Sequence, residues 1–84
     1  MAAIDNFREN LKAVLAEKGV TPGALAGRLH TSRSYIGRIL QGEAEPTVSK
    51  AEAIAHALGV PYISLYLSPA DFAASLHSEH HVPA

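Results

Sequence analysis

The chain has 84 residues, of which 48% are hydrophobic and 18% are charged, and this balance favours one small folded domain. It contains no cysteine, which excludes disulfides, thiolate catalysis and cysteine-based zinc sites. No apolar run approaches the roughly 18 residues that span a membrane, and no signal peptide is recognisable, so we expect a cytoplasmic protein without a membrane partner. The formal net charge is −1, yet the segment 19–42 holds three arginines and no acidic residue, which suits a polyanionic partner.

The beginning of the chain predicts two helices separated by Gly19. Apolar residues of the first recur at helical spacing, at Ile4, Phe7, Leu11, Val14 and Leu15. Gly19 suits the end of this helix, and Thr21 is a typical N-cap for the next. The second helix, about 22–29, opens on Pro22, whose missing N–H costs nothing at that position.

A third helix, about 33–41, is predicted only two or three residues later. Thr31 and Ser32 precede it as capping residues, and Gly42 ends it. Its apolar face consists of Ile36, Ile39 and Leu40. The connection is too short for an antiparallel return, so we expect the second and third helices to cross at a steep angle.

The second half of the chain predicts three further helices. The fourth follows Thr47, stops at Gly59 and has inward residues at Val48, Ala51, Ile54, Ala55 and Leu58. A short fifth helix is expected over 60–67. A sixth is expected from Pro69 to about His77, because Ser68 and Pro69 form a strong start signal. The predicted fold class is therefore all-α.

The third helix carries the residues that indicate a function. Arg33, Ser34 and Arg38 occupy the face opposite Ile36 and Ile39. A helix fits the major groove of DNA, where its first turn can direct long donors at base edges and its N–H groups can meet a phosphate. Arg33 is the best candidate for a bidentate contact with guanine.

The run from Leu11 to Leu65 resembles the phage-repressor and Cro-like (Xre-type) helix-turn-helix family. The pieces that carry the resemblance are Glu17-Lys18-Gly19-Val20-Thr21, Leu25-Ala26, Thr31-Ser32, Tyr35-Ile36, Gly42, Pro46 and Ala57-Leu58-Gly59-Val60. The resemblance implies a compact five-helix, lambda-repressor-like bundle, to which this chain adds a sixth, C-terminal helix. It implies double-stranded DNA as the partner and Arg33, Ser34 and Arg38 as the base readers.

The resemblance also implies contacts with the sugar-phosphate backbone, at Thr21, Ser32, Tyr35 and Gln41. Two interpretations of Arg28 remain open, a phosphate contact and a solvated charge. Tyr35 has a second interpretation as a core aromatic, although Ile36 already takes the inward position. Gly37 has no side chain to read a base, and we interpret it as a point of close approach, either to DNA or to a neighbouring helix.

The chain departs from the family pattern in three ways. Pro22 stands where a glutamine commonly reaches a phosphate, so that contact is absent. His30 replaces the usual glycine of the turn, and its backbone either avoids positive φ or is mildly strained. Glu43 and Glu45 stand where relatives often have lysines, which predicts weaker non-specific binding.

The segment after Gly59 is dense in apolar residues, with Tyr62, Ile63, Leu65, Tyr66 and Leu67 in six positions. One short helix cannot bury all of them against a small core, so the sixth helix or a second copy must cover the remainder. The predicted homodimer interface comprises Tyr62, Ile63, Tyr66, Leu67, Phe72 and Leu76. We accordingly divide the chain into a DNA-binding domain, 1–67, and a C-terminal helix and tail for dimerisation, 68–84.

The remaining candidate chemistry is weak. His77, His80 and His81 have a spacing that metal sites use, but no cysteine accompanies them, and we interpret them as a solubilising tail without a metal site. The serines lack a local histidine and aspartate partner set, and Gly-rich phosphate loops are absent. We expect neither an enzyme nor a cofactor.

The sequence as a whole predicts a dimeric transcriptional repressor that binds an inverted-repeat operator through the major groove. We expect it to be bacterial or phage-encoded and associated with the nucleoid. One alternative is the antitoxin of a toxin–antitoxin pair, which represses its own operon and also binds a toxin. Another is a protein-interaction domain without DNA binding, which Pro22, Glu43 and Glu45 would suit.

Overall fold

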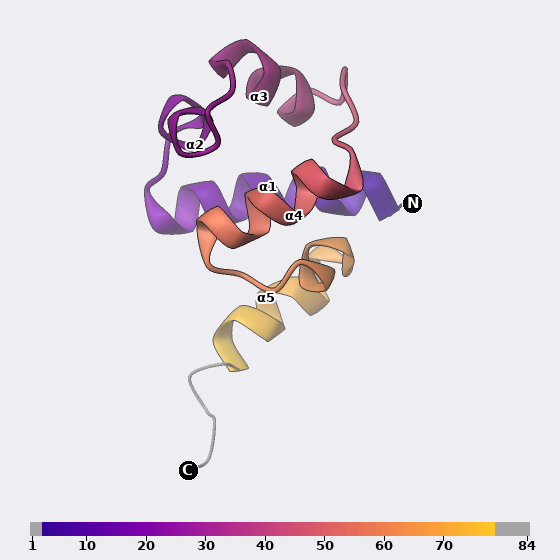
Figure 1. Ribbon diagram of the computed structural model, residues 1–84. Helices are drawn as coiled ribbons and strands as arrows, with labels where there is room; N and C mark the ends of the chain where they lie inside the picture. The colour runs from indigo at the N-terminus through magenta and orange to yellow at the C-terminus, as the bar shows by residue number, and fades with distance from the viewer. Residues whose placement is uncertain (1–2, 79–84) are drawn as a thin grey trace.

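The computed structural model describes residues 3–78, which form five α-helices and one turn of 3-10 helix (Figure 1). In chain order the elements are α1 (Ala3–Lys18), α2 (Pro22–Arg28), α3 (Arg33–Leu40), α4 (Val48–Leu58), the 3-10 turn η1 (Ile63–Tyr66) and α5 (Pro69–Ser78). The described residues contain no strand. The all-α prediction is confirmed for this part of the chain.

The prediction of six α-helices is wrong for residues 3–78. The segment expected as the fifth α-helix, 60–67, contains only η1, so the helix that begins at Pro69 is the fifth. In a continuous α-helix the carbonyl of Leu65 would need the N–H of residue 69, and proline has none. The side-chain amide of Asn10 supplies the missing donor, at 2.9 Å from the Leu65 oxygen and 2.7 Å from the Leu67 oxygen. These carbonyls are therefore satisfied without an α-helix.

The starts of the middle helices follow the local sequence. The hydroxyl of Thr21 accepts from the N–H of Ala24 at 3.1 Å, and Pro22 is the first residue of α2. Ser32 caps α3 and Thr47 caps α4 in the same way, at 3.0 and 3.1 Å. The predicted capping residues Thr21, Ser32 and Thr47 are confirmed.

The predicted helix stops are also confirmed. Gly19, Gly42 and Gly59 follow α1, α3 and α4, and all have positive φ, of 64°, 80° and 69°. A Cβ on Gly42 would also meet the guanidinium at the flexible end of the Arg8 side chain. The N-terminal part of α1 therefore lies directly beside the end of α3.

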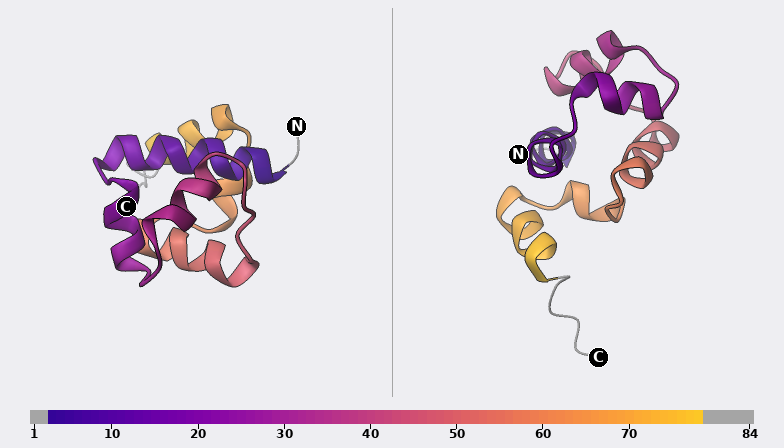
Figure 2. Two further views of the ribbon diagram at one scale, coloured as in Figure 1. Left: turned by 90° about the horizontal axis from the view of Figure 1, so that it is seen from above. Right: turned by 90° about the vertical axis from the view of Figure 1, so that its left-hand side faces the viewer.

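The core is formed around α1. The largest fully buried side chains include Phe7, Leu11, Leu25, Ile36, Ile39, Ile54, Leu65 and Phe72. Figure 2 (right) looks along α1 and shows α2 and α3 on one side of it and η1 and α5 on the other. Val48 was expected to face inward, but it is 65% exposed because the core does not reach the first turn of α4. Within the described residues, no helix is long and apolar enough to cross a membrane.

Candidate nucleic-acid interface

The turn between α2 and α3 is fixed by its own backbone. The N–H of His30 donates to the carbonyl of Gly27 at 3.3 Å, and the N–H of Thr31 donates to that of Ala26 at 3.0 Å. His30 has φ +54°, so of the two expected alternatives the histidine adopts the strained, left-handed conformation. Figure 1 shows α2 nearly end-on while α3 runs across the view, as the short connection predicts.

The two faces of α3 differ sharply. Ile36 and Ile39 are 0% and 2% exposed and attach the helix to the core. The opposite side is exposed and polar, and we call it the α3 face: Arg33, Ser34, Arg38 and Gln41. The structure thus places all three predicted base readers together on one solvent-facing surface of the molecule.

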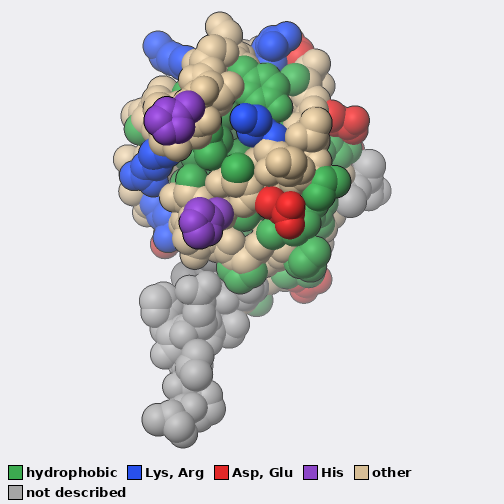
Figure 3. All heavy atoms as spheres, in the orientation of Figure 1, with side chains coloured by type: hydrophobic (Ala, Val, Ile, Leu, Met, Phe, Trp, Pro, Cys, Tyr) green, Lys and Arg blue, Asp and Glu red, His purple; other side chains and the backbone are tan. Residues whose placement is uncertain are grey.

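The arginines of the α3 face have no acidic partner among the described residues. The ion pairs in this part of the chain lie on α1, where Arg8 contacts Asp5 at 3.3 Å and Glu9 at 3.9 Å. Figure 3 shows basic side chains along the upper and left edges of the molecule, over α2 and α3, with most of the visible acidic side chains toward its right side. The guanidinium groups of Arg33 and Arg38 are therefore available to an external anion.

Arg33 is also oriented by the start of α2. A Cβ placed on Gly23 would lie 3.7 Å from the Cδ of Arg33, so the aliphatic stem of this arginine passes over the glycine backbone. Thr21 lies at the same edge, exposed, with its hydroxyl engaged in the cap of α2. The first turns of α2 and α3 thus form one continuous surface.

Tyr35 lies on the flank of α3, between the core and the solvent. Its ring is half-buried and packs partly against the core. The ammonium group of Lys50, from α4, lies 6.0 Å from the centre of the ring. Sequence reasoning missed Lys50, because nothing in the local pattern of α4 places this residue beside α3. It adds a cation to the edge of the α3 face.

Arg28 has a partner inside the chain. Its Nη1 donates to the carbonyl of Ala57 at 3.3 Å, near the C-terminal end of α4. A cation at that end also interacts favourably with the helix dipole. Neither of the alternatives left open for Arg28 included this contact, which joins α2 to α4.

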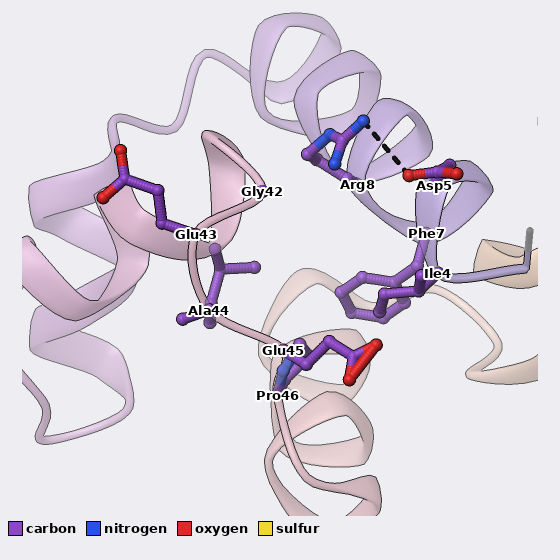
Figure 4. Close-up of a pocket in the computed structure, with 10 residues that line it drawn as sticks. Ile4, Asp5, Phe7, Arg8, Gly42, Glu43, Ala44, Glu45 and Pro46 are labelled. Atoms are coloured by element: carbon purple, nitrogen blue, oxygen red, sulfur yellow. Dashed lines mark ion pairs between the residues drawn. The ribbon is translucent and has the colours of Figure 1, made fainter.

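The loop after α3 forms the acidic end of the surface. The N–H groups of Glu43 and Ala44 both donate to the carbonyl of Arg38, at 2.8 and 3.2 Å, which holds the loop against the last turn of α3. Figure 4 shows the Arg8 side chain directed at Asp5, whereas the carboxylate of Glu43 points away from both. The acidic residues of the loop therefore remain unneutralised by Arg8.

The C-terminal residues predicted for dimerisation separate into two groups. Tyr62, Tyr66 and Leu67 are half-buried and Ile63 is 69% exposed, and we call these four the η1 face. Phe72 is only 1% exposed and belongs to the core, where its helix α5 packs against α1 and η1, so within its own chain it offers no free surface to the predicted interface. The side chains of Leu76 and His77, and the whole of His80 and His81, lie outside the described residues.

The two tyrosines of the η1 face form a connected pair. Their rings meet edge-on with centroids 5.4 Å apart, and the hydroxyl of Tyr62 donates to that of Tyr66 at 3.4 Å. The pKa of Tyr66 is raised to about 12, first by burial and then by the hydrogen bond and the charge of Tyr62. The ring of Tyr66 also lies 5.2 Å from that of Phe7, which ties this surface to the core.

Comparison with protein families assigns the chain on the basis of this region. A family model described as helix-turn-helix matches residues 11–65, which is more than half of the sequence and includes α2, the turn and α3. The chain belongs to the helix-turn-helix family. This is the Xre, Cro and lambda-repressor-like group of DNA-binding transcription regulators. The range is the one over which the sequence resembles the family, and that interpretation is confirmed.

Two other comparisons add no relative. Neither the curated proteins nor the solved structures contain a match to the chain. The helix-turn-helix match therefore carries the assignment by itself, and the roles of individual residues rest on the geometry described above.

Proposed function

We propose that this helix-turn-helix protein is a repressor that recognises a specific double-stranded DNA sequence by inserting α3 into the major groove. The observation that carries the proposal is the α3 face, with two arginines free of acidic partners among the described residues and a buried opposite side. A rigidly anchored helix with unpaired donors is what base-edge recognition requires. Occupation of an operator in this way would block a promoter.

Within this proposal Arg33 makes the main base contact. Its stem is held over Gly23, and a guanidinium so oriented can donate two hydrogen bonds to guanine O6 and N7. Arg38, five residues further along α3, and Ser34 contact neighbouring base edges. These residues determine sequence preference, because contacts to phosphate carry no sequence information.

Residues around this centre hold the phosphates. Ser32 and the first N–H groups of α3 contact phosphates of one strand. The other phosphate contacts come from the start of α2, the flank of α3 and its C-terminal end, at Thr21, Tyr35 and Gln41. Lys50 joins this set because it lies over the Tyr35 ring. Arg28 instead acts within the chain by joining α2 to α4.

The proposal includes a homodimer formed through the η1 face. Ile63 exposes 69% of its surface beside the paired tyrosines, and a second copy is the partner that a two-fold symmetric repressor provides. Two copies would present two α3 helices at half-sites about one turn of DNA, roughly 34 Å, apart. The η1 face then lies at the C-terminal end of the DNA-binding domain, 1–67, and the helix and tail over 68–84 support the dimer from beyond it.

The function is tested by selecting bound duplexes from a random pool and measuring affinity for the selected and a scrambled duplex. Arg33→Ala should weaken binding to the selected duplex by about 1 to 3 kcal/mol and leave the scrambled one nearly unchanged. Arg28→Ala is the matched control, since it removes the same chemistry from a residue with a partner in α4. Recovery of no consensus sequence, or equal effects of the two substitutions on specificity, would contradict the proposal.

A further inference from the structure

Gly37 lies in the middle of α3, where a glycine is costly. α3 has only eight residues, and a glycine inside a helix destabilises it by comparison with alanine. The position is one turn from both Arg33 and Gln41 on the helix surface, so it lies half-buried among the residues of the α3 face.

Nothing in the described part of the chain requires this glycine. Gly37 is not among the glycines with positive φ, which are Gly19, Gly42 and Gly59. A Cβ built on Gly37 finds no heavy atom within 4 Å, whereas the same construction on Gly42 meets Arg8. Of the two close approaches considered from the sequence, the one to a neighbouring helix is thereby excluded for residues 3–78.

The surface at Gly37 is apolar although its neighbours are polar. Its carbonyl accepts from the N–H of Gln41 at 3.0 Å, and its own N–H is used within the helix. The position therefore offers no hydrogen bond, only the Cα atom and the open space where a Cβ would lie, among the helix positions of Arg33, Arg38 and Gln41. We call this open space the notch. A matching group must be small, apolar and placed on the edge of a base.

The C5-methyl group of thymine is the apolar group that the major groove presents. We propose that Gly37 is a specificity-determining residue, and that the notch it leaves on the α3 face receives one thymine methyl of the operator. This inference rests on the proposed function, because it needs α3 in the major groove. It assigns an A·T pair to the position beside those read by the arginines.

A methyl group can be moved from the DNA to the protein to test this. In the selected duplex, each thymine is replaced singly by deoxyuridine, which lacks only the methyl group. One replacement should weaken the unaltered protein about fourfold, the effect of one buried methyl. Gly37→Ala should bind the thymine duplex about tenfold more weakly or worse and should regain affinity on that same deoxyuridine duplex, because the new Cβ then occupies the vacated space.

Gly27→Ala is the matched control. Gly27 also lacks positive φ, and a Cβ there also meets nothing within 4 Å, but it lies on α2. Both substitutions should raise the midpoint of thermal unfolding, and only Gly37→Ala should change DNA affinity. Unaltered operator affinity in Gly37→Ala, equal losses on selected and scrambled duplexes, no deoxyuridine duplex that restores binding, or a lowered unfolding midpoint would each overturn the inference. A wild-type chain that selects no duplex would instead count against the proposed function.

Discussion

The α3 face and the η1 face are both surfaces that the chain leaves open, but they differ in chemistry. The α3 face is polar and cationic, and its arginines contact no carboxylate among the described residues. The η1 face is aromatic and apolar, and two of its rings already contact each other or the core. The first suits a hydrated polyanion and the second suits another protein surface. Salt should therefore mainly weaken binding at the α3 face, and an introduced charge should mainly weaken binding at the η1 face.

The largest effect is expected when the support under the η1 face is removed. Asn10→Ala should lower the free energy of unfolding by about 3 kcal/mol, because the carbonyls of Leu65 and Leu67 lose their donor while a buried space opens. Denaturant unfolding followed by circular dichroism measures this. Asn6→Ala is the control, since Asn6 makes one longer bond, 3.4 Å, to the Tyr66 carbonyl and should cost less than about 1 kcal/mol. Equal losses in the two variants would show that Asn10 has no special role.

A charge placed on the η1 face should act on self-association. Ile63→Asp should weaken self-association by about 2 kcal/mol or more, since a carboxylate would be desolvated at the centre of the interface. Light scattering or sedimentation over a concentration series gives the mass. Val48→Asp is the matched control, because Val48 is similarly exposed, at 65% against 69%, but lies on α4. If Ile63→Asp keeps the mass of the parent protein, the interface must be sought elsewhere.

The smallest effect is expected at the edge of the α3 face. Lys50→Ala should reduce the slope of log affinity against log salt by about 1, because one phosphate neutralisation is lost, and should leave sequence preference intact. Binding titrations at several salt concentrations provide the slope. Lys12→Ala removes a lysine from α1, where it contacts Glu9 at 3.5 Å, and should leave the slope unchanged. The same slope for both variants would remove Lys50 from the DNA contacts.

The fold of the middle of the chain could be predicted because its signals are local. The hydroxyls of Thr21, Ser32 and Thr47 act within three residues, and Gly42 and Gly59 stop helices through their own backbone conformation. The periodicity of α3 likewise fixed which residues share its exposed face. The segment 60–67 could not be predicted, because its conformation depends on an amide 55 residues earlier in the sequence.

The same distinction applies to the candidate site. Arg33, Ser34 and Arg38 were found from one helix and its period. The partner of Arg28 and the position of Lys50 depend on where α4 lies, and the open space at Gly37 depends on what does not lie beside it. Such facts are properties of the packed molecule and leave no local pattern in the sequence.

Asn10 has a consequence for how small this protein can be made. The family match begins at residue 11 and ends at residue 65. Asn10 therefore lies just before the matched region, and its amide donates to the carbonyl of Leu65, the last matched residue. A fragment trimmed to the matched boundaries would discard Asn10, Phe7 and the second anchored carbonyl, that of Leu67. The minimal autonomous unit of this chain therefore extends beyond the family signature at both ends.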